Sequence, residues 1–297
     1  MKKTLTFLLI ICCMAVTVYV SACNGNENKL SRYEIYASYD ESAGTVTGSV
    51  KLDFYNDTDN ELSDLKFNLY GNAFREGAKF KPVSDAYKSR AYYAGESYGK
   101  MEISGVENCA GWNVGGEDEN TLTVNLLTPI YPEETVTVTI NYTLTLAKVN
   151  HRTGITARTV NLGNFYPILC AYTGEGFLEC PYYYCGDPFV SECANYSVTI
   201  DLPPEYIAAS SGKLVSESET DGRKKCTLGS MHRRAGKQSY RGAVSKLRHA
   251  RKDADAYAGR AAKIHILVRV LQKQGGAHTF GVARYTGQVR RGSAVYP

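Results

Sequence analysis

The 297-residue sequence is poor in several residue types, and these scarcities exclude classes of protein. With one Trp, nine Pro and no low-complexity stretch, the chain is neither collagen-like nor fully disordered. No cysteine pair has the C-x-x-C spacing that is typical of a zinc cluster. None of the five His precedes a Glu, so the sequence holds no H-E-x-x-H zinc motif. These residues are His151, His232, His249, His265 and His278.

Acidic residues are almost missing from the last quarter of the chain. Residues 226–297 hold 15 Lys/Arg against Asp253 and Asp255, whereas residues 24–225 hold 17 Lys/Arg against 28 Asp/Glu. No Glu follows Glu219. The formal net charge of +4 at pH 7 therefore conceals an acidic body joined to a strongly basic tail.

The first residues have the form of an export signal. Two lysines, an apolar run at residues 5–20 and small residues before Cys23 make up its three parts. Cys23 resembles the lipidated cysteine of bacterial lipoproteins, in which two acyl chains give durable anchoring. We expect a signal peptide at residues 1–22, a lipid on Cys23, a linker at residues 23–32 and attachment to the outer face of the cell membrane. The alternative is a transmembrane anchor, for which the apolar run is slightly short.

Apolar and polar residues alternate along the body of the chain. Six segments show the period of two that is typical of half-buried strands, and turn residues lie between them. We therefore expect an all-β domain over residues 33–225, built as an antiparallel β-sandwich or saddle. The six segments are residues 33–39, 46–54, 65–69, 122–126, 135–146 and 196–202.

Three blocks of sequence resemble one family. The first block has YEI at residues 33–35, TGSV at 47–50 and LKFNLYGNAF at 65–74. The second has NFYP at 164–167 and GEGF at 174–177. The third has GDPF at 186–189, ANYSVTIDLP at 194–203 and AASSG at 208–212. Their order and spacing resemble the N-terminal β-saddle domain of gluzincin zinc aminopeptidases of the membrane alanyl type, over about residues 30–215.

The resemblance implies an activity that this chain does not carry alone. In that family zinc lies in the following domain, on a helix with H-E-x-x-H, and zinc-bound water cleaves the N-terminal residue from a peptide. Because this motif is missing, we expect no catalytic residue, no metal ligand and no cofactor here; zinc and peptide substrate belong to full-length relatives. Met101 and Glu102 echo the family's substrate-binding strand, but we interpret them as ordinary strand residues.

Acidic residues gather in the region where the family's saddle domain holds the amino terminus of its substrate. Glu175, Glu179 and Glu192 lie near three tyrosines at residues 182–184. Asp187 is typical of a turn, because a proline follows it. No single one of these residues matches the family closely enough to be assigned as substrate-binding.

The cysteines of the body leave their redox state open. They are predicted to be buried thiols or, in an exported protein, to form disulfides such as Cys180–Cys185 or Cys170–Cys193. The five are Cys109, Cys170, Cys180, Cys185 and Cys193, and Cys226 lies at the change in composition.

The basic tail at residues 226–297 has two interpretations. It is a basic arm that binds anionic lipid headgroups or polymers, with a helix at residues 245–262 and a strand at residues 263–271. Alternatively, and as we favour, it is a frameshifted translation, which would explain why acidic residues and strand periodicity cease together. No nucleic acid is expected as a partner of an exported chain.

Two functions compete at this point. The favoured one is the N-terminal, substrate-side domain of an exported zinc metallopeptidase, present as a lipoprotein without the catalytic zinc motif. The alternative is a non-catalytic β-sandwich lipoprotein that binds a peptide or a glycan at the cell surface.

Overall fold

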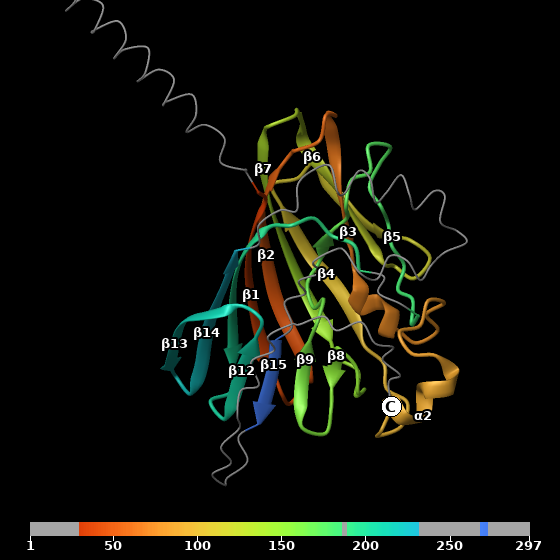
Figure 1. The fold of residues 1–297 in the computed structure, drawn as a ribbon, viewed down its shortest axis with the longest axis vertical. Coiled ribbons are helices and arrows are strands. Elements are labelled where there is room, and N and C mark those ends of the chain that lie inside the picture. The colour runs from red at the N-terminus through yellow and green to blue at the C-terminus, as the bar shows by residue number, and fades with distance from the viewer. Residues whose placement is uncertain (1–29, 186–188, 232–267, 273–297) are drawn as a thin grey trace, which may run out of the picture.

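The fold consists of three β-sheets and a few short helices (Figure 1). The computed structural model describes residues 30–185, 189–231 and 268–272. The all-β prediction is confirmed, with sheets that are mainly antiparallel. The signal peptide, Cys23 and the helix predicted at residues 245–262 lie outside the described residues.

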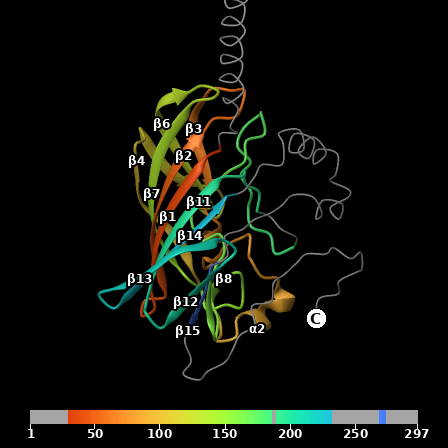
Figure 2. The same ribbon diagram turned by 60° about the vertical axis from the view of Figure 1, so that its left-hand side comes forward.

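The largest sheet has seven strands in the order β13-β14-β11-β1-β2-β7-β4 (Figure 2). Neighbouring strands are antiparallel except for β1 and β11, which are parallel. A parallel pair needs a long connection, and here the chain builds the whole sheet β10-β3-β6-β5 and the strands β8 and β9 before it returns as β11. The strands are β1 (Arg32–Asp40), β2 (Thr45–Tyr55), β4 (Lys100–Glu107), β7 (Thr135–Thr145), β11 (Asn195–Leu202), β13 (Lys213–Thr220) and β14 (Arg223–Met231).

Two four-stranded sheets complete the β structure. One has the order β10-β3-β6-β5 and the other β12-β15-β9-β8. The first comprises β3 (Leu62–Asn68), β5 (Gly111–Gly115), β6 (Thr121–Ile130) and β10 (Ile168–Leu169). The second comprises β8 (Thr153–Ile155), β9 (Thr159–Leu162), β12 (Tyr206–Ser210) and β15 (Val268–Gln272). The short helices are η1 (Tyr70–Phe74), η2 (Asp85–Tyr87) and α2 (Lys88–Ala91).

All six strands predicted from alternation are present, as β1, β2, β3, β6, β7 and β11. The expectation that strand structure ends at residue 225 is wrong, because β14 continues to Met231 and buries Cys226 and Leu228. The turn at Asp221 and Gly222 explains this continuation. Both residues have positive φ (53° and 68°), as the tight turn of a β-hairpin requires. In the tail, β15 overlaps the strand predicted at residues 263–271.

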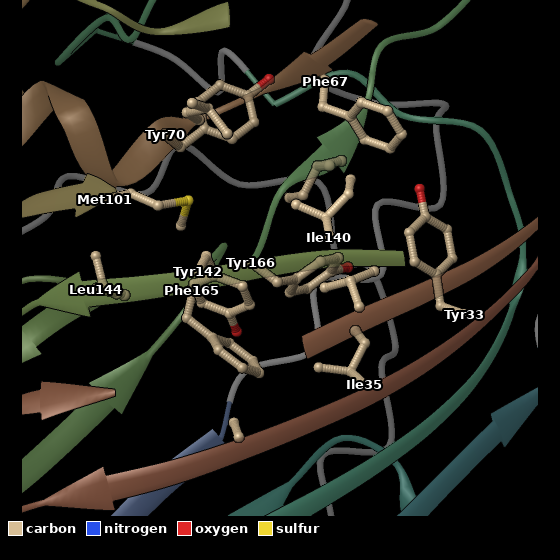
Figure 3. Packing of buried hydrophobic residues seen from close by; sticks show 14 of the residues in the cluster. Tyr33, Ile35, Phe67, Tyr70, Met101, Ile140, Tyr142, Leu144, Phe165 and Tyr166 are labelled. Atoms are coloured by element: carbon tan, nitrogen blue, oxygen red, sulfur yellow. The ribbon is translucent and has the colours of Figure 1, made fainter. Parts of the chain in front are cut away.

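One apolar core is shared by all three sheets. Along β7, Val138, Ile140, Tyr142 and Leu144 are buried, and the threonines between them lie on the more exposed face. Figure 3 shows rings from other segments, among them Phe67 of β3, gathered around Ile140 and Tyr142. The burial of alternate residues therefore fixes which face of the large sheet the smaller sheets cover.

A polar network ties β1, β11 and β14 together on the opposite face of the large sheet. The Arg223 guanidinium donates to Asp201 Oδ1 at 2.6 Å, to Ser38 Oγ at 3.1 Å and to the Tyr39 carbonyl at 3.0 Å. The Tyr36 hydroxyl donates to Asp201 Oδ2 at 3.1 Å. Asp201 is only 7% exposed, so its carboxylate has little contact with water. These donors compensate its charge in place of water.

No helix within the described ranges is long and apolar enough to cross a membrane.

One close contact in the core lies between β2 and β7, where Gly48 faces Tyr142. A Cβ added to Gly48 would lie 2.5 Å from both Cζ and Oη of Tyr142. Tyr142 is fully buried, and its hydroxyl has no hydrogen-bond partner among the described residues, so packing holds its ring in place. The ring of Tyr142, which lies opposite position 48 in the β2–β7 ladder, therefore requires glycine at that position.

We predict that Gly48→Ala lowers the free energy of unfolding by about 1–3 kcal/mol, because the ring of Tyr142 must leave its packed position. Gly111→Ala in β5 is the matched control, since the nearest heavy atom to its new Cβ is Asn125 Nδ2 at 3.9 Å. Urea denaturation of both variants measures the difference. Equal stability of the two would show that the ring has room to move.

Candidate functional site

The three family-like sequence blocks meet in a cluster of tyrosines. Tyr33 of the first block, Tyr166 of the second and Tyr196 of the third lie against one another. The rings of Tyr33 and Tyr196 stack with centroids 4.9 Å apart and planes 11° apart, and the Tyr166 ring meets Tyr33 edge-on at 5.9 Å. The Tyr33 hydroxyl accepts a hydrogen bond from the Leu169 amide at 3.2 Å. Blocks far apart in sequence therefore form one packed unit.

Burial keeps these phenols in their neutral form. It raises the pKa of Tyr33 and Tyr166, and it raises the pKa of Tyr196 to about 12. A neutral phenol donates a hydrogen bond but offers no negative charge near pH 7. The tyrosine cluster therefore contributes packing and carries no charge near pH 7.

A second aromatic cluster forms below η1. Tyr70 and Phe74 of η1 pack against Tyr182 and Phe189, with Tyr70 and Phe189 centroids 4.7 Å apart. The Arg152 guanidinium lies over the Phe189 ring at 4.5 Å, a cation–π contact. This cluster fixes the segment that carries the exposed tyrosines at residues 183 and 184.

Two buried polar side chains position η1 and the loop after it. Asn72 donates from Nδ2 to the Glu119 carbonyl at 2.6 Å and accepts the Met101 amide at 2.7 Å. Asp118 accepts the amides of Lys79 and Phe80, each at 2.8 Å. Asn72 belongs to the first family-like block, but the sequence pattern does not predict these hydrogen bonds, because their partners lie on distant segments. Met101 lies in β4, as expected for an ordinary strand residue.

His151 lies beside the second aromatic cluster. Its ring centroid is 5.5 Å from that of Phe74 and 5.9 Å from that of Tyr182. Its Nε2 is 3.5 Å from the Tyr182 hydroxyl. Burial lowers the pKa of His151 to about 4; the neighbouring charge of Arg152 adds to this shift, and a hydrogen bond with the Pro82 backbone opposes it. The imidazole is therefore neutral at pH 7.

The described residues do not fit a catalytic zinc site. Of the five His, His151 alone is described, and it is surrounded by rings and an arginine. No group of three or more His, Cys, Asp or Glu within residues 30–185, 189–231 and 268–272 could hold a metal ion. Since a catalytic zinc needs about three protein ligands, no step through a metal can be assigned to these residues.

The acidic residues near the three tyrosines have separate surroundings. Glu179 pairs with Lys66 at 2.5 Å. Glu192 lines a small hollow with Ser31 and Tyr33, and burial raises the pKa of its carboxyl. Glu175 is exposed at the tip of a hairpin, and Asp187 lies outside the described residues. Nearness in sequence therefore does not give these carboxylates a common ligand.

Neither of the two disulfides that the sequence left open is formed. Cys170, Cys180 and Cys185 are free thiols, as are Cys109 and Cys226. Burial raises the pKa of Cys170, and it raises that of Cys180 to about 11. Cys170 and Cys226 are buried, whereas Cys185 is exposed, so the prediction of buried thiols applies to only part of the set.

Comparison with known proteins gives a likeness of fold. No protein-family model matches the sequence, and no curated protein matches it. An M1 zinc metallopeptidase from Deinococcus radiodurans resembles the structure at 18% identity and a TM-score of 0.42, covering 68% of this chain and 38% of its own. A mutant of the M1 zinc metallopeptidase from the same organism, bound to a Tyr-Ser-Ala substrate, matches at 16% identity and a TM-score of 0.40. The match covers 68% of this chain and 38% of the mutant's chain.

A two-domain M1 zinc metallopeptidase mutant bound to L-tryptophan matches at 17% identity and a TM-score of 0.41. The match covers 68% of this chain and 39% of the mutant's chain. The chain thus spans less than two fifths of the length of these structures. The matched structures are described as zinc metallopeptidases, the class of enzyme that the three sequence blocks resemble. At these identities and TM-scores the likeness concerns the fold and carries nothing about activity.

We predict that His151 makes the protein less stable in acid. Its pKa in the folded protein is about 4, below the ordinary value of 6.5, so the unfolded chain takes up a proton that the folded chain resists. Stability is therefore lost as the pH falls from about 6.5 to about 4, by up to about 3 kcal/mol.

The control is His151→Phe, which keeps a ring beside Phe74 and Tyr182 but cannot titrate. Denaturant unfolding of both proteins between pH 4 and pH 7 isolates the contribution of His151. Parallel stability curves for the two proteins would contradict the prediction.

Proposed function

We propose that this chain is the N-terminal, substrate-side domain of an exported zinc metallopeptidase of aminopeptidase type, held at the membrane by a lipid on Cys23. The observation that carries the proposal is the meeting of the three family-like blocks. Tyr33, Tyr166 and Tyr196 make one cluster, and Tyr70 and Phe189 make another. Residues that match a family in order and also pack together are shared parts of one architecture rather than separate coincidences.

In this proposal the chain supplies a rigid surface and a following domain supplies the chemistry. Zinc bound to H-E-x-x-H in that domain would activate a water molecule for peptide cleavage. The neutral His151 and the buried tyrosines of this chain hold loops in place and transfer no proton.

The coding DNA tests the missing domain. We expect translation of the other two reading frames beyond codon 225 to reveal H-E-x-x-H. Absence of the motif from both frames would contradict the proposal that a catalytic domain belongs to this gene.

The alternative, a non-catalytic lipoprotein that binds peptide or glycan, is favoured by exposed aromatic rings. Tyr183 is 51% exposed and Tyr184 is 58% exposed, next to the second aromatic cluster. Exposed rings on a fixed support are typical of binding surfaces. Titration calorimetry with peptides and oligosaccharides would favour this alternative if binding occurred while no downstream H-E-x-x-H existed.

We predict that the purified chain holds no stoichiometric zinc and does not hydrolyse alanyl or leucyl chromogenic substrates. The reason is that none of its His is part of an H-E-x-x-H motif. Elemental analysis after dialysis and a turnover assay measure both properties. One tightly held zinc per chain, with turnover that a chelator abolishes, would contradict the prediction.

We predict that Cys23→Ala releases the protein from membranes or leaves its signal peptide uncleaved, because Cys23 carries the lipid. Cys13→Ala is the matched control, since Cys13 lies inside the predicted signal peptide. Membrane fractionation with intact-mass analysis distinguishes the forms. A processed Cys23→Ala chain that stays in the membrane fraction would contradict lipidation at this position.

A further inference from the structure

The sheet β12-β15-β9-β8 is joined in an unusual way. β12 and β9 do not pair with each other; β15 lies between them and is antiparallel to both (Figure 1). Because neighbouring strands lie about 4.8 Å apart, β9 and β12 border a space about 10 Å wide that fits one extended segment. We call this space the β9–β12 slot.

Both walls of the slot are held by contacts that do not involve β15. On one side β9 pairs with β8, and Asn161 donates to the His151 carbonyl at 2.7 Å. On the other side Tyr206 of β12 packs against Tyr39 at 5.8 Å, and its carbonyl accepts Lys224 Nζ at 2.8 Å. The walls therefore have positions of their own, independent of what lies between them.

β15 is distant in sequence from the strands that it joins. Thirty-six residues separate it from the end of β14 at Met231. Closing a loop of this length costs little more than closing one half as long. Within the described residues, β15 forms its ladders with β9 and β12 alone. Backbone pairing on both sides therefore joins it to the sheet.

We propose that the β9–β12 slot is a strand-acceptor site for an extended peptide, and that the tail segment Val268–Gln272 is its occupant within this chain. The walls offer backbone N–H and C=O groups on both sides, which any extended segment can pair with. Two-sided pairing distinguishes this site from an ordinary sheet edge. Both walls precede codon 225, so the acceptor site does not depend on the reading frame of the tail, and it lies outside the tyrosine clusters.

The acceptor selects its occupant by alternation. Val160 and Leu162 of β9 are buried in the shared core, and Ala208 of β12 packs against that core. Residues directly opposite one another in a ladder share a face, so occupant positions opposite Val160 and Leu162 belong to the core face. In this chain these register positions are 270 and 268, and both carry Val. The site should therefore accept apolar residues at these two positions and polar residues at the position between them.

The test uses full-length chains. Val270→Pro removes a backbone N–H from the middle of β15, whereas Val270→Thr keeps the N–H and the β-branched shape and is the matched control. We expect amides of β9 and β12 to exchange with solvent at least about tenfold faster in the proline variant than in the control, with β2 and β7 unchanged. Unchanged exchange in β9 and β12 would overturn the proposal.

A fluorescein-labelled synthetic peptide of residues 266–274 then probes the emptied slot. We expect it to bind the proline variant at least about tenfold more tightly than the wild-type chain and to restore protection in β9 and β12. A peptide with Asp at position 270 should bind at least about tenfold more weakly than one with Asp at position 269. Failure to bind or to restore protection, or equal binding of the two Asp peptides, would overturn the proposal.

If the proline variant also loses protection in β2 and β7, Val270→Asp replaces it, because this change keeps every backbone N–H. The same peptide measurements and the same outcomes then apply.

Discussion

The parallel ladder between β1 and β11 is the constraint on which most of this structure depends. It pairs Ser38 with Asp201, and the Tyr36 hydroxyl donates to the Asp201 carboxylate, 165 positions away in sequence. The ladder places the ring of Tyr33 against that of Tyr196. It also adds β11 to the large sheet, and the hairpin β13–β14 then pairs with β11. Long-range pairing of this kind forms late and slowly, because the entropic cost of closing a large loop comes before any contact compensates for that cost.

The same ladder explains why the two faces of the large sheet differ. On one face it adds Ile35 and Val198 to the apolar core. On the other it brings Asp201 within reach of Arg223 and Tyr36. Replacement of either charged partner would leave the other insufficiently compensated, so this polar face is specific in its geometry even though it is partly open to water.

Sequence patterns could predict the strands that are buried on one face, and little else. β2 and β7 alternate because one face of each meets the core, and both were expected within a residue or two of their observed ends. β13 carries no such pattern, because all eight of its residues are exposed. The dipeptide Asp221-Gly222 was the available signal for its hairpin. β8 and β10 are too short, at three and two residues, for any period to be recognised.

The candidate site was predictable only as a set of blocks, and the tail only in part. The blocks could be recognised in order, but the contact of His151 with Phe74 and Tyr182 depends on segments that approach from distant parts of the chain. The change of composition at residue 226 suggested that the β domain ends there, yet β14 crosses it. Charged residues lie mainly on the surface, so a change in charge composition says little about buried positions. The buried residues Cys226 and Leu228 continue the strand across the change.

The raised thiol pKa values have a kinetic consequence. Disulfide exchange proceeds through the thiolate, and at neutral pH a thiol such as Cys180, with a pKa of about 11, is almost entirely protonated. Cys226 has a pKa of about 11 as well, because burial and the nearby Glu217 carboxylate both disfavour its anion. Such thiols react slowly with oxidants even where oxidation is thermodynamically favourable. Cys170, Cys180 and Cys226 are therefore slow to be oxidised while the core stays folded, and transient unfolding is the step that would expose them.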